Sequence, residues 1–185
     1  MQAIEALRRR FSGRVLKDPA PDAGALTLML ESALHAPDHG RLRPWRFIVI
    51  QGEGRGRFGE LLASYVRRAR PSATAEMLER ERQKAFRAPL IIVVAAVTAP
   101  SAKVPAIEQV LSAGAAAQNI LLAAFSLGFN GVWKTGDAAY DETVKSALGL
   151  EAKDAIVGFL YVGTEESGLP PPPRPAVQDF LRHWP

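Results

Sequence analysis

The chain has 185 residues, of which 48% are hydrophobic and 23% charged; these values indicate a single globular domain, residues 1–185, and exclude a disordered or collagen-like chain. The absence of cysteine excludes disulfide scaffolds, thiolate metal sites and cysteine nucleophiles, and it favours a reducing cytoplasm as the location. The formal net charge of +4 allows attraction to phosphates without requiring nucleic acid, and we expect no nucleic-acid partner.

The N-terminal half predicts alternating helices and strands. It begins without the apolar run of a secretion signal, which agrees with a cytoplasmic protein. Ile4, Leu7 and Phe11 recur at helical spacing and predict a short helix that ends near Gly13. Asp22 is the expected N-cap of a second helix. The further elements predicted in this half are a strand at 45–50, a helix between residues 56 and 71, and a helix at 75–87.

The C-terminal half contains the most apolar segments. Residues 90–97 form a continuous β-branched run without alternation, which predicts a strand covered on both faces. Residues 107–127 are apolar nearly all round and predict a helix buried at the centre of the fold. Polar residues interrupt this segment, so we expect no membrane span. The further elements predicted here are a strand at 129–134, a helix at 143–148 and a strand at 156–163.

The end of the chain, residues 164–185, is predicted to be a proline-rich arm and tail. Four consecutive prolines at 170–173 favour a stiff, extended polyproline II connector. The residues beyond them include Val177, Phe180 and Trp184, which is too much apolar surface for a disordered tail. Two arrangements are open: the tail folds back on its own domain, or the stiff arm delivers it to a partner subunit.

Two motifs resemble known binding patterns but lack the context that these patterns need. Residues 54–59 satisfy the G-x-G-x-x-G dinucleotide fingerprint, yet the next strand starts only at Leu90 and ends without a carboxylate, so we favour a turn followed by a helix start. His35 and His39 have the spacing of a zinc pair, but Pro37 breaks that helix and we expect no metal. Without a serine-hydrolase elbow, P-loop or deaminase pattern, an enzyme of this kind takes its chemistry from a cofactor.

Three segments, in order along the chain, carry a resemblance to one family. Arg-Arg-Phe-Ser-Gly-Arg at 9–14 is similar to an Arg-Arg-Ser-x-Arg pattern. Residues 36–45 resemble an Ala-Pro-Ser-x-x-x-x-Gln-Pro-Trp loop, with Ala-Pro-Asp-His at its start. The third segment is the apolar helix with the strand that follows it, 112–136. Together these segments resemble the FMN-dependent NAD(P)H nitroreductase family, and they are closest to its short YdjA-type branch.

The resemblance implies an FMN cofactor whose phosphate, with a charge near −2, is bound at the end of the first helix. Two guanidinium groups and a hydroxyl there would make charge-assisted hydrogen bonds with that phosphate. An arginine-rich helix end that complements the helix dipole is the alternative. The flavin contacts that the resemblance implies are Arg10, Phe11, Ser12, Arg14, His35, His39, Trp133, Lys134 and Thr135.

These implied contacts come from different parts of a dimer. His35 and His39 would reach a flavin bound mainly by the other subunit, with surface histidines beside a turn as the alternative. Lys134 would place a positive charge near the reduced ring. For Trp133, core packing at a strand end is the alternative. Arg174 resembles a C-terminal phosphate contact of longer relatives. The residues implied to lie near the nicotinamide are Ala123, Ala124, Phe125, Ser126, Leu127 and Gly128, with ordinary helix packing as the alternative.

The fold implied by the resemblance is α+β: a mixed, mainly antiparallel sheet of about four strands flanked by helices, in an intertwined homodimer. The implied reaction is a two-electron, ping-pong transfer in which NAD(P)H reduces the flavin and a nitroaromatic or quinone oxidises it, with no catalytic side chain. The alternatives are another flavin reaction on the same fold and a non-catalytic flavin-binding or storage protein. Phe11 and Arg43 depart from the family pattern, so the choice of substrate stays open.

Overall fold

The computed structural model describes residues 2–101, 103–166, 168 and 170–184. Helices and strands follow one another in nearly the order that the sequence predicts. The helices are α1 (Ala3–Arg9), α2 (Ala23–Ala33), α3 (Gly54–Ala69), α4 (Ala75–Gln83), α5 (Ala106–Ser126) and α6 (Glu142–Ala147). The strands are β1 (Leu16–Lys17), β2 (Trp45–Gln51), β3 (Leu90–Ala96), β4 (Asn130–Lys134) and β5 (Ala155–Glu165). Short 3₁₀ turns are η1 (His39–Arg41), η2 (Lys84–Phe86), η3 (Asp137–Tyr140) and η4 (Val177–Asp179).

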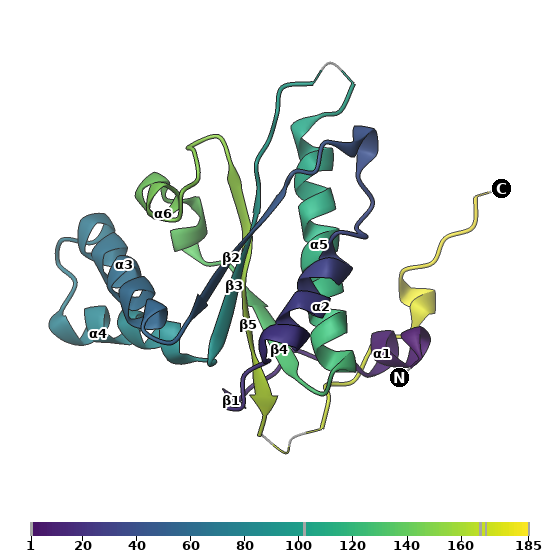
Figure 1. Ribbon diagram of the computed structural model, residues 1–185, viewed down its shortest axis with the longest axis horizontal. Helices are drawn as coiled ribbons and strands as arrows, with labels where there is room; N and C mark the ends of the chain where they lie inside the picture. Colours follow the sequence, from purple (N-terminus) through teal and green to yellow (C-terminus); the bar gives the residue numbers. More distant parts are fainter. Residues whose placement is uncertain (1, 102, 167, 169, 185) are drawn as a thin grey trace.

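One sheet forms the centre of the molecule (Figure 1). Its strand order is β1-β5-β3-β2, with β4 also paired to β5, and every pair of named strands is antiparallel. The predicted mainly antiparallel α+β sheet is therefore confirmed. The predicted number of about four strands misses β1, because a strand of two residues leaves no alternation in the sequence.

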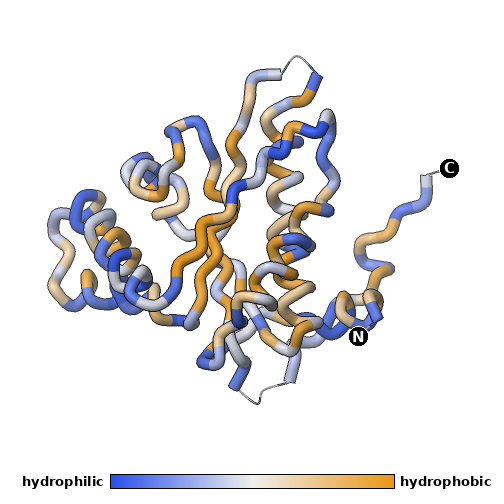
Figure 2. Tube along the Cα trace, viewed as in Figure 1, coloured by the Kyte–Doolittle hydropathy of each residue, from blue (hydrophilic) through white to orange (hydrophobic). Residues whose placement is uncertain are grey.

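Helices cover both faces of this sheet, so two apolar layers fill the core. Helices α2 and α5 lie on one face, and α3, α4 and α6 lie on the other (Figure 1). Every residue of β3 is buried, which confirms a strand covered on both faces. The central strands are also the most continuously hydrophobic part of the trace (Figure 2). No helix in the described part of the chain is long and apolar enough to cross a membrane.

The first helix ends earlier than the sequence predicts. It stops at Arg9, and Arg10 leaves the helical region with φ −57° and ψ 133°. Ser12 then forms an isolated parallel bridge with Gly131 of β4. The prediction of helix up to Gly13 was wrong, because pairing with the edge of β4 extends this segment.

The glycine-rich motif at 54–59 forms the first turns of α3, which agrees with the interpretation as a helix start. Strand β2 before it and strand β3 after it are antiparallel neighbours, so no Rossmann crossover exists here. A Cβ at Gly59 would lie 2.9 Å from the carbonyl oxygen of Arg82, so this glycine allows α3 and α4 to approach closely.

The tail after the proline arm stays exposed in a single chain. Four of its apolar side chains, those of Val177, Phe180, Leu181 and Trp184, are at least half exposed. Figure 1 shows the chain leaving the domain beside α1 and ending away from it. The tail therefore does not fold back into the core of its own domain.

Substitution of Gly158 tests how β4 is held against the core. A Cβ at this position of β5 would overlap the indole of Trp133, so we expect Gly158→Ala to lower the free energy of unfolding by about 1–3 kcal/mol, the usual cost of overpacking. Urea unfolding followed by tryptophan fluorescence measures the change. Gly56→Ala is the matched control: no atom lies within 4 Å of its added Cβ, and it should leave stability unchanged or slightly higher.

Candidate functional site

A cavity of about 740 Å³ opens where the segment after α1, strand β1, the end of η2, strand β4 and the C-terminal arm meet. We call it the basic cavity, because among the described residues that line it five side chains are basic and none is acidic. The five are Arg14, Lys17, Arg87, Lys134 and Arg174. Such a surface attracts anions.

Backbone contacts position the first wall of the basic cavity. The amide of Gly13 donates to the carbonyl of Gly131 at 3.1 Å, beside the bridge made by Ser12. The carboxylate of Glu165 accepts from the amides of Arg14 at 2.8 Å and Val15 at 3.3 Å. The segment is thus fixed through its backbone, and the hydroxyl of Ser12 and the guanidinium of Arg14 line the cavity.

Arg174, which lines the basic cavity, is held against the backbone of Arg10. Nη2 of Arg174 donates to the carbonyl of Arg10 at 2.7 Å. Burial, and then the charge of Arg174, lower the pKa of Arg10. Like charges held this close repel, and an anion between such groups removes the repulsion and adds charge-assisted hydrogen bonds. The pair therefore favours an anionic ligand.

Most cations of the basic cavity have no protein partner. Within the described residues, the side chains of Arg14, Arg87 and Lys134 make no hydrogen bond or ion pair, whereas Lys17 pairs with Glu166 at 3.2 Å. Sequence reasoning missed Arg87. Its one signal was its place directly before the Ala-Pro pair that opens β3, and only the tertiary fold brings it to β4.

Strand β4 connects the basic cavity to a second one. Val132 and Lys134 lie on the same face of the strand, and Lys134 is three residues, or roughly 10 Å, beyond the Gly131 bridge. Lys134 and Arg87 also line a cavity of about 470 Å³ between α3, α4, β5 and the 134–138 loop, which we call the α3–α4 cavity. Thr135 lines this second cavity. Arg87 and Lys134 therefore border both cavities.

Trp133 points to the opposite face of the sheet. Its indole Nε1–H donates to the carbonyl of Val157 at 3.1 Å, and its ring lies beside Gly158 and Gly114. The side chain packs with the α5 layer of the core. Core packing, the alternative interpretation, therefore describes this side chain, and a flavin contact through Trp133 stays a prediction for its backbone only.

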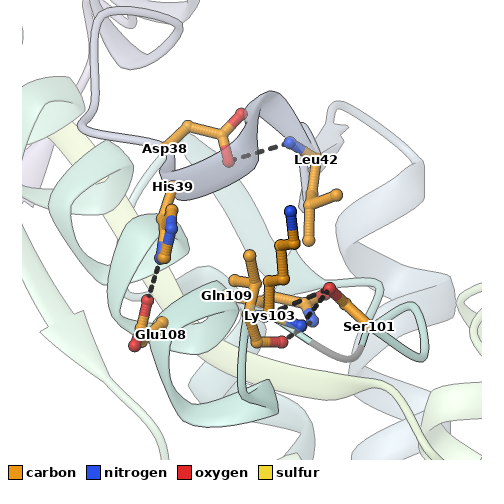
Figure 3. A network of polar contacts seen from close by, with 8 residues as sticks. Asp38, His39, Leu42, Ser101, Lys103, Glu108 and Gln109 are labelled. Carbon is orange, nitrogen blue, oxygen red and sulfur yellow. Dashed lines mark hydrogen bonds and ion pairs between the residues drawn. The ribbon is translucent and has the colours of Figure 1, made fainter.

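The two histidines lie away from both cavities of their own chain. His35 follows α2 and is exposed. Nδ1 of His39 lies 2.6 Å from Oε2 of Glu108 on α5 (Figure 3). The carboxylate of Asp38 accepts from the amides of Leu42 and Arg43 and shapes this loop. Neither histidine lines the basic or the α3–α4 cavity, so a flavin contact from them requires another subunit and stays a prediction.

Residues 123–128 end α5, on the α2–α5 side of the sheet. Gly128 ends the helix with φ +90°, and the amide of Phe129 donates to the carbonyl of Ala124 at 3.0 Å. The ring of Phe125 meets that of Phe11 edge to face, 6.5 Å between centroids. Within their own chain these residues pack the helix end and line neither large cavity, so their nicotinamide role, like a flavin contact by Phe11, stays a prediction.

Comparisons with known proteins agree with this architecture. The sequence model described as "Nitroreductase family" matches residues 7–164. The chain is 40% identical over 185 residues to "Putative NAD(P)H nitroreductase YdjA" of Escherichia coli (strain K12), covering 97% of this chain and all of the relative. It is 37% identical over 165 residues to a protein from Haemophilus influenzae described as "Putative NAD(P)H nitroreductase", covering 89% of each chain.

Solved structures show the same fold. A nitroreductase-like family protein from Bacillus cereus superposes with a TM-score of 0.81 at 24% identity, covering 100% of this chain and 96% of the other. A Desulfovibrio desulfuricans protein described as a putative nitroreductase in complex with FMN gives a TM-score of 0.76 at 25% identity, covering 100% and 98%. The family match and the near full-length relatives lead to one conclusion: the chain belongs to the nitroreductase family.

Proposed function

We propose that the protein is an FMN-dependent oxidoreductase that takes hydride from NAD(P)H and reduces nitroaromatics or quinones in two-electron steps by a ping-pong route. The observation that carries the proposal is the basic cavity, where Arg10 and Arg174 are held together beside unpaired cations. The FMN-bound neighbour and the NAD(P)H named in the relatives support the choice of cofactor and reductant. The absence of cysteine supports the proposed cytoplasmic location.

The residues present fit FMN. Ser12, Arg14 and Arg174 would hold its phosphate, with Arg10 adding charge behind Arg174. Lys134 stands further along β4, where it would favour a ring that gains negative charge. Bound FMN would supply hydride acceptance and donation at its N5 atom. The chain's own groups would bind and orient the FMN and stabilise the negative charge of its reduced ring. No side chain is needed as a nucleophile.

We propose a homodimer as the working form. In a single chain, apolar side chains on α1, on α5 and along the tail are exposed to solvent. This distribution fits contact with a second copy of the chain. His35, His39 and residues 123–128 line neither cavity of their own chain, so their predicted cofactor contacts would be made across that subunit contact.

Substitutions at the basic cavity test the phosphate anchor. Hydrogen bonds to charged groups contribute about 1.5–3 kcal/mol, so Ser12→Ala and Arg14→Gln should each weaken FMN binding by roughly 10- to 100-fold. Titration with FMN followed by quenching of flavin fluorescence measures the dissociation constant. Arg9→Gln is the control: this substitution removes the same charge as Arg14→Gln, but Arg9 pairs with Glu5 on the surface of α1. Unchanged affinity in both test variants would contradict the anchor.

Steady-state kinetics test the reaction. We expect the FMN-loaded protein to sustain oxidation of NADPH or NADH only when a nitroaromatic or quinone is present, with parallel lines in double-reciprocal plots, as a ping-pong route requires. A flavin-loaded protein that NAD(P)H never reduces would indicate flavin storage. Reduction of the flavin without transfer to either acceptor class would indicate another flavin reaction.

Changes in the tail test the dimer. The exposed rings of Phe180 and Trp184 bury apolar surface only if a partner covers them, so Phe180→Ser with Trp184→Ser should shift the full-length chain from dimer toward monomer. Sedimentation velocity over a range of concentrations measures the shift. Arg182→Ser changes the same exposed tail without removing apolar surface and serves as the control. A full-length chain that sediments as a monomer would rule out the dimer.

A further inference from the structure

The α3–α4 cavity is not used by the phosphate anchor, and its size suits a small ligand. It measures about 470 Å³, within the usual range of roughly 300–1,000 Å³ for ligand pockets. Apolar side chains from α3, α4 and β5 form part of its wall: Leu62, Val66, Met77 and Phe159. The aromatic ring of Tyr65 adds to that wall. A surface of this kind suits a flat, apolar group.

Tyr161 on β5 places a hydroxyl donor at this cavity. The residue is only 3% exposed, and its hydroxyl has no hydrogen-bond partner among the described residues. Burial raises the pKa of Tyr161 to about 12, so the hydroxyl is protonated at neutral pH and can donate. Because Tyr161 lines the cavity, its hydroxyl could donate a hydrogen bond to an acceptor on a bound ligand.

The charges around the cavity are mainly positive. Five of its lining side chains are basic and two are acidic. The two acidic residues are Glu81 and Asp137. Nζ of Lys84 donates to Oε2 of Glu81 at 2.6 Å. The side chains of Arg70 and Arg80 make no hydrogen bond or ion pair with any described residue. The rim therefore offers two free guanidinium groups to an anion.

We propose that the α3–α4 cavity binds the anionic, aromatic end of a redox substrate, with the ring against the apolar wall, the anion on Arg70 and Arg80, and Tyr161 donating a hydrogen bond. The inference rests on the proposed function, because Arg87 and Lys134 join this cavity to the predicted flavin site. Two substrates carry this chemistry: the 2′-phosphoadenosine end of NADPH, and a nitroaromatic oxidant that bears a carboxylate.

Calorimetric titration of the FMN-loaded protein tests the cavity without relying on turnover. The probes are 2′,5′-ADP against 5′-AMP for the dinucleotide, and 4-nitrobenzoate against 4-nitrotoluene for the oxidant. We expect the more anionic member of at least one pair to bind ten-fold tighter or more. Arg80→Gln should reduce that advantage by about ten-fold, and Tyr161→Phe should weaken binding of the more anionic member by about ten-fold. Arg67→Gln, an exposed arginine of α3 that does not line the cavity, should leave both unchanged.

The pair that responds identifies the source of the ligand. An effect on 2′,5′-ADP indicates the dinucleotide and should be accompanied by a loss of preference for NADPH over NADH in kcat/KM. An effect on 4-nitrobenzoate indicates the oxidant. If neither pair shows the advantage, or if Arg80→Gln and Tyr161→Phe behave like Arg67→Gln, the inference is wrong. Because the titration needs no turnover, it tests ligand binding at the α3–α4 cavity even when the protein does not catalyse the proposed reaction.

Discussion

The candidate site depends on the pairing of the segment after α1 with strand β4. Ser12 bridges Gly131, and the carboxylate of Glu165 accepts the amides of Arg14 and Val15. These contacts use only the backbone of the segment, so its cationic and hydroxyl groups stay available to a ligand. A helix continued to Gly13 would distribute those side chains around its axis, whereas an extended segment places alternate side chains on one side.

The rest of the fold offsets the electrostatic cost of this arrangement. Arg10 and Arg174 repel each other, and burial of Arg10 adds to that cost. The apolar layers on both faces of the sheet, with every residue of β3 buried, supply the stability that tolerates it. Trp133 contributes from the far face, since its indole joins β4 to β5 and α5. One strand thus carries a core side chain on one face and a ligand-facing lysine on the other.

Local patterns predicted those elements that depend on local sequence. The cap of α2 at Asp22, the apolar run of β3 and the alanine-rich α5 were all visible in the sequence and are present. Strand β1 was not, because two residues pair only after β5 is in place. Arg87 and Tyr161 stayed hidden for the same reason. Each looks like an ordinary residue beside or within a strand, and only packing brings them together at a cavity wall.

Arg87 and Lys134 belong to both cavities, and this sharing has a thermodynamic consequence. An anion in either cavity neutralises part of the positive field that the other cavity offers. Two anionic occupants would therefore share the field of these two cations, and each would weaken the other's binding by an identical factor, as reciprocity of linked equilibria demands. Binding of two charged ligands to this chain is therefore anticooperative, although each anion keeps its own direct contacts.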